Sequence, residues 1–262
     1  MRCFMTYTNV WVVIALDVEL DTGIAMNLMF GDCLERMKEI PDGSVDLILA
    51  DPPYGTTACK WDVVIPFDAM WAELKRIIKP NGAIVLFANQ PFTSLLVCSN
   101  LKMYKHNWVW EKSRSGSAIS AKHCPVKIHE DILVFCKNSP NYRPIMEEGM
   151  PYSRKSRYKN ENNHKFGITN NVETNNVGTR FPKTIRFEKQ NWSKQQQLHP
   201  TQKPVALMEY LIKTYTQEGE TVLDFVMGSG TTGVAAKKLN RKFIGIEKDA
   251  GYFEIPKQRL GV

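Results

Sequence analysis

The chain has 262 residues and a formal net charge of +7, which is the size of one large domain or two small ones. Hydrophobic residues make up 43% of it and aromatic residues 10%. That is ample for a packed core, and it excludes a disordered, collagen-like or disulfide-stapled chain. The longest apolar run, residues 10–16, is far shorter than the ~18 residues that cross a bilayer. Composition therefore predicts a soluble globular protein with no membrane partner.

Six cysteines are scattered along the chain without a CxxC pair, which argues against a zinc ribbon and a disulfide framework. This usage favours a reducing cytoplasm. His123, Cys124, His129 and Cys136 have side chains that can bind metal, but their spacing fits no tetrahedral site. We therefore expect no metal ion.

Alternating strands and helices are predicted on both sides of a polar central stretch. Residues 1–25 fit no such element, and we interpret them as an extension or a spurious start before Met26. The first half predicts strand 27–30, strand 45–50, helix 68–79, strand 83–88, strand 109–111 and strand 131–136. The second half predicts helix 203–217, strand 221–225, helix 231–239 and strand 242–247. Such alternation requires a parallel sheet covered on both faces, so the expected fold is α/β and doubly wound.

The positive charge is concentrated between residues 137 and 194, where twelve basic residues stand against five acidic ones. This stretch carries the whole net charge, and asparagines and aromatic residues lie between its charges. A solvated insert would explain the charge. Cations also meet phosphates and amides read base edges, so we favour a nucleic-acid surface. Its candidate contacts are Arg154, Lys155, Arg157, Lys159, Arg180, Lys183 and Arg186.

A glycine-rich motif, GSGTTG at residues 228–233, follows a predicted strand and opens a helix. This is the setting that GxGxxG requires, because the glycines admit a ligand close to the backbone and the helix N-terminus offers free N–H groups. Glu247 ends the next strand, where a carboxylate can bind both hydroxyls of a ribose. The pattern predicts a nucleoside site, with a structural glycine turn as the alternative. By itself it does not separate a nicotinamide dinucleotide from S-adenosylmethionine.

Asp51-Pro52-Pro53-Tyr54 follows strand 45–50, at the end where open α/β sheets bind ligands. The two prolines remove N–H donors and fix φ, so the segment becomes a rigid bracket. The Asp51 carboxylate and the Pro52 carbonyl then face one spot as acceptors, with the Tyr54 ring beside them. An exocyclic amino group on a planar base would fit, because it donates two hydrogens and offers a face for stacking. An ordinary turn is the alternative.

These motifs stand in the order typical of the permuted (β-class) amino-group DNA methyltransferases: DPPY, a target-recognition insertion, HPTQKP (199–204), LDFVMGSGTTG (223–233) and FIGIE (243–247). The sequence resembles this family from about residue 26 to nearly its end, and is most similar to small orphan or phage-borne members. The resemblance implies a circularly permuted, Rossmann-like fold with a catalytic half at 26–136, the insertion at 137–198 and a cofactor-binding half at 199–262. It also implies S-adenosylmethionine as methyl donor and base flipping in double-stranded DNA.

The resemblance assigns the target base to Asp51, Pro52, Pro53 and Tyr54. It assigns the cofactor to Asp32, His199, Thr201, Lys203, Asp224, Phe225, Gly228, Ser229, Gly230, Thr231 and Glu247. In this assignment Asp32 contacts the adenine amino group of the cofactor, Glu247 its ribose, and Lys203 with its neighbours the methionine end. Pro256 departs from the family pattern, and we expect it to interrupt and shorten the last helix.

The leading hypothesis is direct in-line methyl transfer to adenine N6, accelerated by positioning and oriented acceptors. An Asp at the first motif position goes mostly with adenine in this family, so cytosine N4 is the alternative. Cytosine C5 is disfavoured because Cys124 precedes Pro125 instead of following a proline. A nicotinamide dehydrogenase leaves DPPY unexplained, and a non-catalytic DNA-binding remnant is the remaining alternative. We further expect a bacterial cytoplasm, with a phage or prophage origin, and consider a homodimer.

Overall fold

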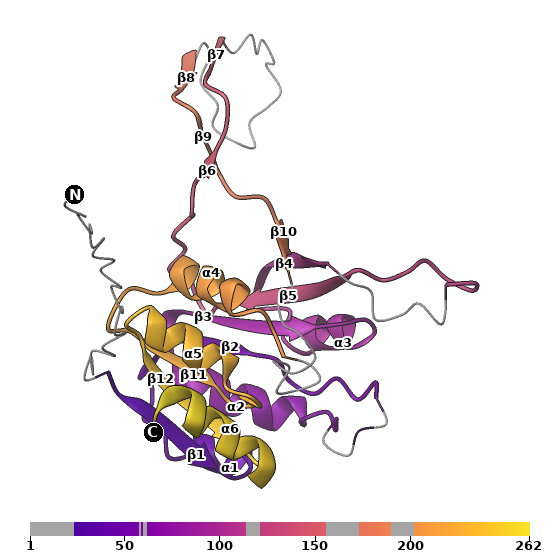
Figure 1. Cartoon of the computed structure of the whole chain (residues 1–262), viewed down its shortest axis with the longest axis vertical. Helices are drawn as coiled ribbons and strands as arrows, with labels where there is room; N and C mark the ends of the chain where they lie inside the picture. Colours follow the sequence, from indigo (N-terminus) through magenta and orange to yellow (C-terminus); the bar gives the residue numbers. More distant parts are fainter. Residues whose placement is uncertain (1–23, 58, 60–61, 114–120, 156–172, 190–201) are drawn as a thin grey trace, which may run out of the picture.

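An eight-stranded sheet forms the centre of the protein, and helices cover both of its faces (Figure 1). The computed structural model describes residues 24–57, 59, 62–113, 121–155, 173–189 and 202–262. Its helices are α1 (Cys33–Met37), α2 (Phe67–Ile77), α3 (Phe92–Ser99), α4 (Val205–Tyr215), α5 (Thr231–Lys238) and α6 (Ala250–Leu260). The central strands are β1 (Met26–Phe30), β2 (Val45–Ala50), β3 (Ile78–Ala88), β4 (Tyr104–Lys112), β5 (His129–Phe135), β10 (Ile185–Glu188), β11 (Thr221–Asp224) and β12 (Lys242–Glu247).

The strand order of the sheet is β1-β12-β11-β2-β3-β5-β4-β10. Neighbouring strands from β1 to β3 all run parallel, which confirms the predicted α/β, Rossmann-like fold. The prediction of a parallel sheet is wrong at β5, which runs antiparallel to both β3 and β4. β4 and β5 follow each other in the chain, and consecutive strands that pair directly do so in the antiparallel sense, whereas parallel pairs need a long crossover.

The two halves of the chain interleave in the sheet. β1, from the start of the described chain, pairs with β12 near its end, and β11 of the second half pairs with β2 of the first. The carboxyl ends of β1, β12, β11 and β2 therefore lie side by side at one edge. Every motif of the predicted site that the structure describes, apart from Lys203, follows one of these four ends, so the permuted strand order gathers them.

Helices α1, α2 and α3 pack on one face of the sheet and α4, α5 and α6 on the other. β3 shows how the alternation of a strand serves both layers. Ile84, Leu86 and Ala88 join the first core, while Ala83, Val85 and Phe87 join the second. All six residues of β2 are buried, as expected for a strand covered on both faces. Each fully buried aliphatic side chain stabilises the fold by about 1.5–3 kcal/mol.

Two elements of the first half differ from the sequence prediction. α2 ends at Ile77, and β3 begins at once, so residues 80–82, which separate the predicted helix 68–79 from the predicted strand 83–88, lie inside a strand. A register shift opposite Val45 and Leu47 absorbs the irregularity. Gly82 is required there, because a Cβ would lie 2.8 Å from the carbonyl oxygen of Asp46. α3 was not predicted, because its short sequence FTSLLVCS shows no clear helical periodicity of apolar residues.

The expectation that Pro256 interrupts the last helix is wrong. α6 runs from Ala250 to Leu260 with Pro256 inside it and buried. Asp249 caps the helix by accepting from the backbone N–H groups of Gly251 and Tyr252. The proline costs the helix a backbone hydrogen bond, but its ring packs against Gly230 of the glycine-rich loop. Packing between distant segments therefore offsets a local helix breaker.

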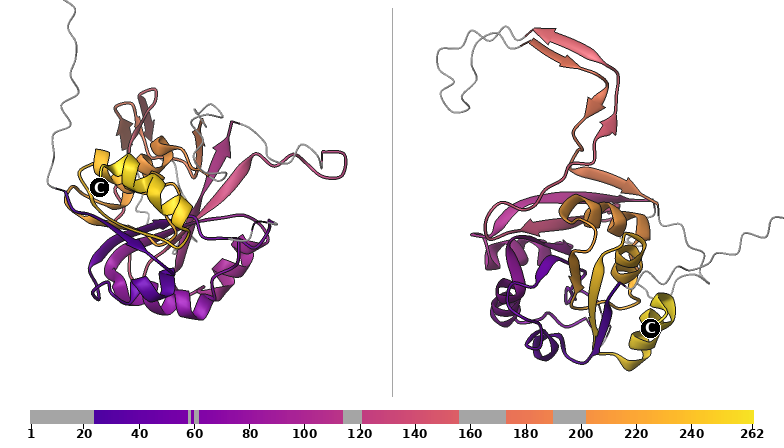
Figure 2. Two further views of the ribbon diagram at one scale, coloured as in Figure 1. Left: turned by 60° about the horizontal axis from the view of Figure 1, so that its bottom comes forward. Right: turned by 90° about the vertical axis from the view of Figure 1, so that its left-hand side faces the viewer.

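The basic insertion forms an arm that projects away from the sheet (Figures 1 and 2). Two short antiparallel ladders build it: β6 (Glu147–Glu148) with β9 (Thr179–Arg180), and β7 (Tyr152–Lys155) with β8 (Glu173–Asn176). The arm does not account for all of residues 137–198, because β10 returns to the central sheet and pairs in parallel with β4. Among the described helices, none combines the length and apolar character needed to cross a membrane.

Candidate active site

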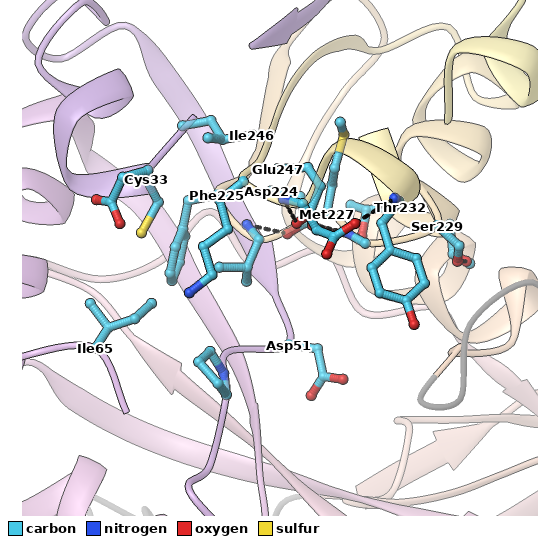
Figure 3. Close-up of a pocket in the computed structure, with 18 of the residues that line it drawn as sticks. Cys33, Asp51, Ile65, Asp224, Phe225, Met227, Ser229, Thr232, Ile246 and Glu247 are labelled. Atoms are coloured by element: carbon cyan, nitrogen blue, oxygen red, sulfur yellow. Dashed lines mark hydrogen bonds between the residues drawn. The ribbon is translucent and has the colours of Figure 1, made fainter. Parts of the chain in front are cut away.

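A pocket of about 1170 Å³, its open mouth included, lies where the carboxyl ends of β1, β2, β11 and β12 meet (Figure 3). Most of the predicted site residues line it. These are Asp32, Asp51, Pro53, Lys203, Asp224, Phe225, Gly228, Ser229, Thr231 and Glu247. His199 and Thr201 lie outside the described residues. The strand order thus brings the predicted base-binding and cofactor-binding motifs to opposite walls of one cavity.

Backbone donors fix the carboxylate of Glu247 at the end of β12. The backbone N–H of Gly228 donates to its Oε2 at 2.9 Å, and that of Asp249 donates to its Oε1 at 2.8 Å. Gly228 has φ +50°, a conformation that favours glycine. Each carboxylate oxygen keeps a free acceptor position. Glu247 can therefore accept hydrogen bonds from two neighbouring hydroxyl groups.

Gly230, predicted to bind the cofactor, packs closely against α6. It adopts φ +72°, and a Cβ on it would lie 2.5 Å from the Cβ of Pro256. Gly230 itself does not line the pocket. The absent side chain makes room for Pro256 of α6. Arg259 of α6 holds the same loop from behind by donating to the carbonyl oxygen of Ser229.

Asp224, the last residue of β11, is buried below the glycine-rich loop. Its Oδ2 accepts from the Thr232 hydroxyl at 2.6 Å, and its Oδ1 accepts from the Val226 N–H at 3.2 Å. Burial raises the pKa of Asp224 to about 7, against the lowering effect of these hydrogen bonds. Asp224 therefore gains or loses a proton near neutral pH. Asp32, at the rim, caps α1 by accepting from the Leu34 N–H at 2.9 Å.

Asp51 stands at the end of β2 with both carboxylate oxygens engaged. The Tyr54 hydroxyl donates to Oδ1, and Lys203 Nζ donates to Oδ2 at 2.7 Å. The Tyr54 ring is held against Phe92 of α3, with 5.1 Å between ring centroids. The bracket predicted from DPPY is thus tied down by an aromatic neighbour as well as by its prolines.

Lys203, which the resemblance assigns to the methionine end of a cofactor, lines the pocket, and its ammonium group lies between two carboxylates. Besides Asp51, it lies 3.1 Å from Glu130 Oε2 of β5. Lys112 of β4 pairs with the other oxygen of Glu130 at 2.9 Å. Burial lowers the pKa of Lys203, but the two carboxylates outweigh it and raise that pKa to about 12. Glu130 was missed by the sequence analysis because it lies inside a strand, far along the chain from both partners.

Asp62 is a second site residue that the sequence analysis missed. Its carboxylate accepts from the backbone N–H groups of Gly55, Thr56 and Thr57 at 2.8, 2.9 and 2.7 Å. These hydrogen bonds outweigh the effect of burial and lower the pKa of Asp62. The loop that follows Tyr54 is therefore fixed by a charged acceptor. Its only sequence signal was an acidic residue shortly after DPPY.

The basic residues predicted to meet DNA fall into two groups. Arg180 stacks on Tyr152 and donates to backbone and side-chain oxygens within the arm. Arg186 of β10 pairs with Glu147 of the arm at 2.6 Å and stacks on Tyr210 of α4 at 4.1 Å, so it fastens the base of the arm to the central domain. By contrast, the side chains of Arg154, Lys155 and Lys183 are exposed. Arg157 and Lys159 lie outside the described residues.

The fold and pocket define the class of protein. A glycine-rich loop opens α5, a fixed carboxylate ends the next strand, and a rigid acceptor bracket faces both across one cavity. This is the arrangement of a Rossmann-like enzyme that binds a nucleoside cofactor. Within the described residues, no three His, Cys, Asp or Glu side chains gather as a metal site would require.

The N6_N4_Mtase family, described as DNA methylase, matches residues 45–258, and the chain belongs to this family of DNA methyltransferases. A protein named DNA adenine methyltransferase YhdJ from Escherichia coli (strain K12) is 33% identical over 91% of this chain and 83% of its own. The type II methyltransferase M.HpaI of Haemophilus parainfluenzae is 30% identical over 89% of this chain and 73% of its own.

Solved structures agree with the fold. A complex of M1.HpyAVI with SAM superposes with a TM-score of 0.60 at 26% identity and covers 90% of this chain and 100% of that one. The cytosine-N4-specific PvuII DNA methyltransferase superposes with a TM-score of 0.66 over 90% of this chain and 86% of its own. At 18% identity this second likeness concerns the fold alone.

Proposed function

We propose that this protein transfers a methyl group from S-adenosylmethionine to adenine N6 in double-stranded DNA. The observation that carries the proposal is that Asp51 of the acceptor bracket and Glu247 of the nucleoside site line the same pocket. A relative named DNA adenine methyltransferase and a neighbour solved with SAM support the substrate and the cofactor.

The residues of the pocket fit S-adenosylmethionine. Glu247 has free acceptor positions for the ribose hydroxyls, and Asp32 offers a carboxylate to the adenine amino group at the rim. The loop from Gly228 to Thr231 and the buried Asp224 line the wall that would receive the methionine part. Bound S-adenosylmethionine supplies an activated methyl group.

The bracket would orient the target base once it has been flipped out of the duplex. Asp51 and the carbonyl oxygen of Pro52 each accept one hydrogen of N6, and the Tyr54 ring stacks on the purine. With both hydrogens held, the nitrogen lone pair points out of the ring plane toward the cofactor side of the pocket. The proton that N6 loses after transfer passes to solvent. The rate of methyl transfer then depends on the orientation of the base and on the fixed acceptors of the bracket, and no covalent enzyme intermediate forms.

The identity of the product tests this function. We expect DNA treated with enzyme and methyl-labelled S-adenosylmethionine, then digested to nucleosides, to release label with N6-methyladenine. A carboxylate is a stronger acceptor than a hydroxyl, and stacking of a base on an aromatic ring is worth about 1–3 kcal/mol, which favours the larger purine. If the label elutes with N4-methylcytosine, the target base is cytosine and not adenine. Label in neither nucleoside would support a non-catalytic DNA-binding protein.

The exposed basic residues of the arm are proposed to contact phosphates. Neutralising Arg154, Lys155 and Lys183 to glutamine should weaken binding to all DNA sequences. It should also reduce the slope of log K against log salt by about 0.9 for each phosphate that the protein no longer neutralises. The matched control replaces Lys213 and Lys242, which are exposed at the opposite edge of the sheet from the pocket. If the arm variant and the control have equal slopes, these basic side chains do not contact phosphates and are only solvated surface charges.

The domain roles, the cellular location and the oligomeric state are also proposals. Residues 26–136 and 199–262 are proposed as the catalytic and cofactor-binding halves, and the insertion at 137–198 is proposed to recognise the target sequence. A DNA substrate and relatives from bacteria favour action in a bacterial cytoplasm, and a phage or prophage origin is a further hypothesis. A homodimer is also a hypothesis: Leu95 and Leu101, at α3 and just after it, are 57% and 67% exposed and offer an apolar contact, which sedimentation of the purified protein would test.

A further inference from the structure

Four charged side chains from separate segments meet behind the acceptor bracket. Lys203 Nζ lies between Asp51 Oδ2 and Glu130 Oε2, at 2.7 and 3.1 Å, and Lys112 Nζ lies 2.9 Å from Glu130 Oε1. The direct transfer described above uses only Asp51 of this cluster. We propose that Lys203 and Glu130 are positioning residues for methyl transfer: Lys203 keeps the Asp51 carboxylate charged, and Glu130 holds the Lys203 ammonium in place so that Asp51 stays aimed at the target amino group. This inference rests on the proposed function.

A buried Asp51 needs a cation to serve as an acceptor. Burial raises the pKa of Asp51 and favours the protonated acid, whereas Lys203 opposes this effect. In a protonated carboxyl group one oxygen carries a hydrogen, and that oxygen donates instead of accepting. A carboxylate has about four acceptor positions, so it can keep the hydrogen bonds from Lys203 and Tyr54 and still accept from an amino group.

Glu130 gives the buried Lys203 ammonium a second carboxylate partner, so the lysine does not pair with Asp51 alone. The Lys203 side chain is only 7% exposed, and its ammonium lies over the ring of Phe87, 5.0 Å from the centroid. With a second carboxylate on its other side, the ammonium is shared between Asp51 and Glu130. Lys112 balances the extra negative charge. The four groups together are neutral, which limits the cost of burying them.

The cluster predicts opposite effects on Asp51 when its two neighbours are changed. The groups that face Asp51 are Tyr54 from the bracket, Lys203 from the segment before α4 and Glu130 from β5, with Asp224 acting from across the pocket. Removing the Lys203 charge should raise the pKa of Asp51. Removing the Glu130 charge should lower it, because a like charge is lost. If the cluster only stabilised the fold, these pKa shifts would not move the acidic limb of the kcat–pH profile.

The test measures kcat against pH with labelled S-adenosylmethionine and genomic DNA from a host that lacks methylation. In Lys203→Met the acidic limb of the profile should move up by about 1–3 pH units. In Glu130→Gln it should move down, and the double variant should lie between them. Lys79→Met is the matched control, because it breaks a lysine–aspartate pair of 2.6 Å with Asp46 at the far end of β2. Its acidic limb should stay at the wild-type position.

Shifts of the same sign in the two single variants, or lower kcat with unmoved limbs, would overturn the proposal. Thermal unfolding and the calorimetric Kd for S-adenosylmethionine identify a variant that has lost its fold. If Lys203→Met does not fold, the downward shift in Glu130→Gln remains decisive. Carboxyl ¹³C NMR titration of Asp51 measures the same shifts without turnover. A wild-type protein that transfers no methyl group would therefore refute the proposed function and still leave the cluster tested.

Discussion

Replacing Asp51 by alanine is expected to lower kcat for methyl transfer by about 10²–10³-fold while the Kd for S-adenosylmethionine changes only several-fold. Loss of one oriented polar group at a reacting centre has an effect of that size. Asp51 lies on the wall opposite Glu247, so the proposed contacts to the ribose should survive. Lys203 would keep Glu130 as a partner, at 3.1 Å, so the variant should fold.

Calorimetry and single-turnover kinetics on the same preparation would separate the two effects. Asp51→Asn is the matched variant, because an amide keeps the shape of the side chain but offers one acceptor oxygen instead of two. We expect it to be nearly as slow as Asp51→Ala. Loss of cofactor binding together with activity would show that Asp51 belongs to the cofactor site, and an active Asp51→Asn would remove the need for a carboxylate.

The second large effect is on stability. Gly230→Ala is expected to reduce the free energy of unfolding by about 2–5 kcal/mol. The left-handed conformation at φ +72° costs a side chain about 1–2 kcal/mol, and overpacking against the Cβ of Pro256 adds about 1–3 kcal/mol. The change should also weaken cofactor binding, because the clash displaces either the glycine-rich loop or α6.

Gly219→Ala is the matched control for this experiment. Gly219 also has a positive φ, +78°, but a Cβ on it would meet nothing within 4 Å. This variant should therefore lose only the conformational term of about 1–2 kcal/mol. Urea unfolding of both variants measures the difference. If both variants lose the same free energy of unfolding, Pro256 moves aside without an energetic cost. The absent side chain of Gly230 is then not needed for the packing of α6.

The sequence by itself determined the features that depend on neighbouring residues. The period-two and helical patterns located most strands and helices, because covered strands and amphipathic helices bury regular sets of side chains. DPPY and GSGTTG predicted a rigid bracket and a glycine loop for the same reason, since prolines and glycines act on the local backbone. Their order along the chain also indicated the family to which the protein belongs.

Only the tertiary structure decided which distant residues meet. Lys203 and Asp51 are 152 positions apart, and no local pattern predicts that they share a hydrogen bond or that Glu130 completes the cluster. The same holds for Pro256, whose helix-breaking tendency is offset by packing against Gly230. Arg186 likewise has the sequence character of a phosphate contact but pairs with Glu147 at the base of the arm. These contacts follow from strand order and register, which depend on the burial of both faces of the sheet at once.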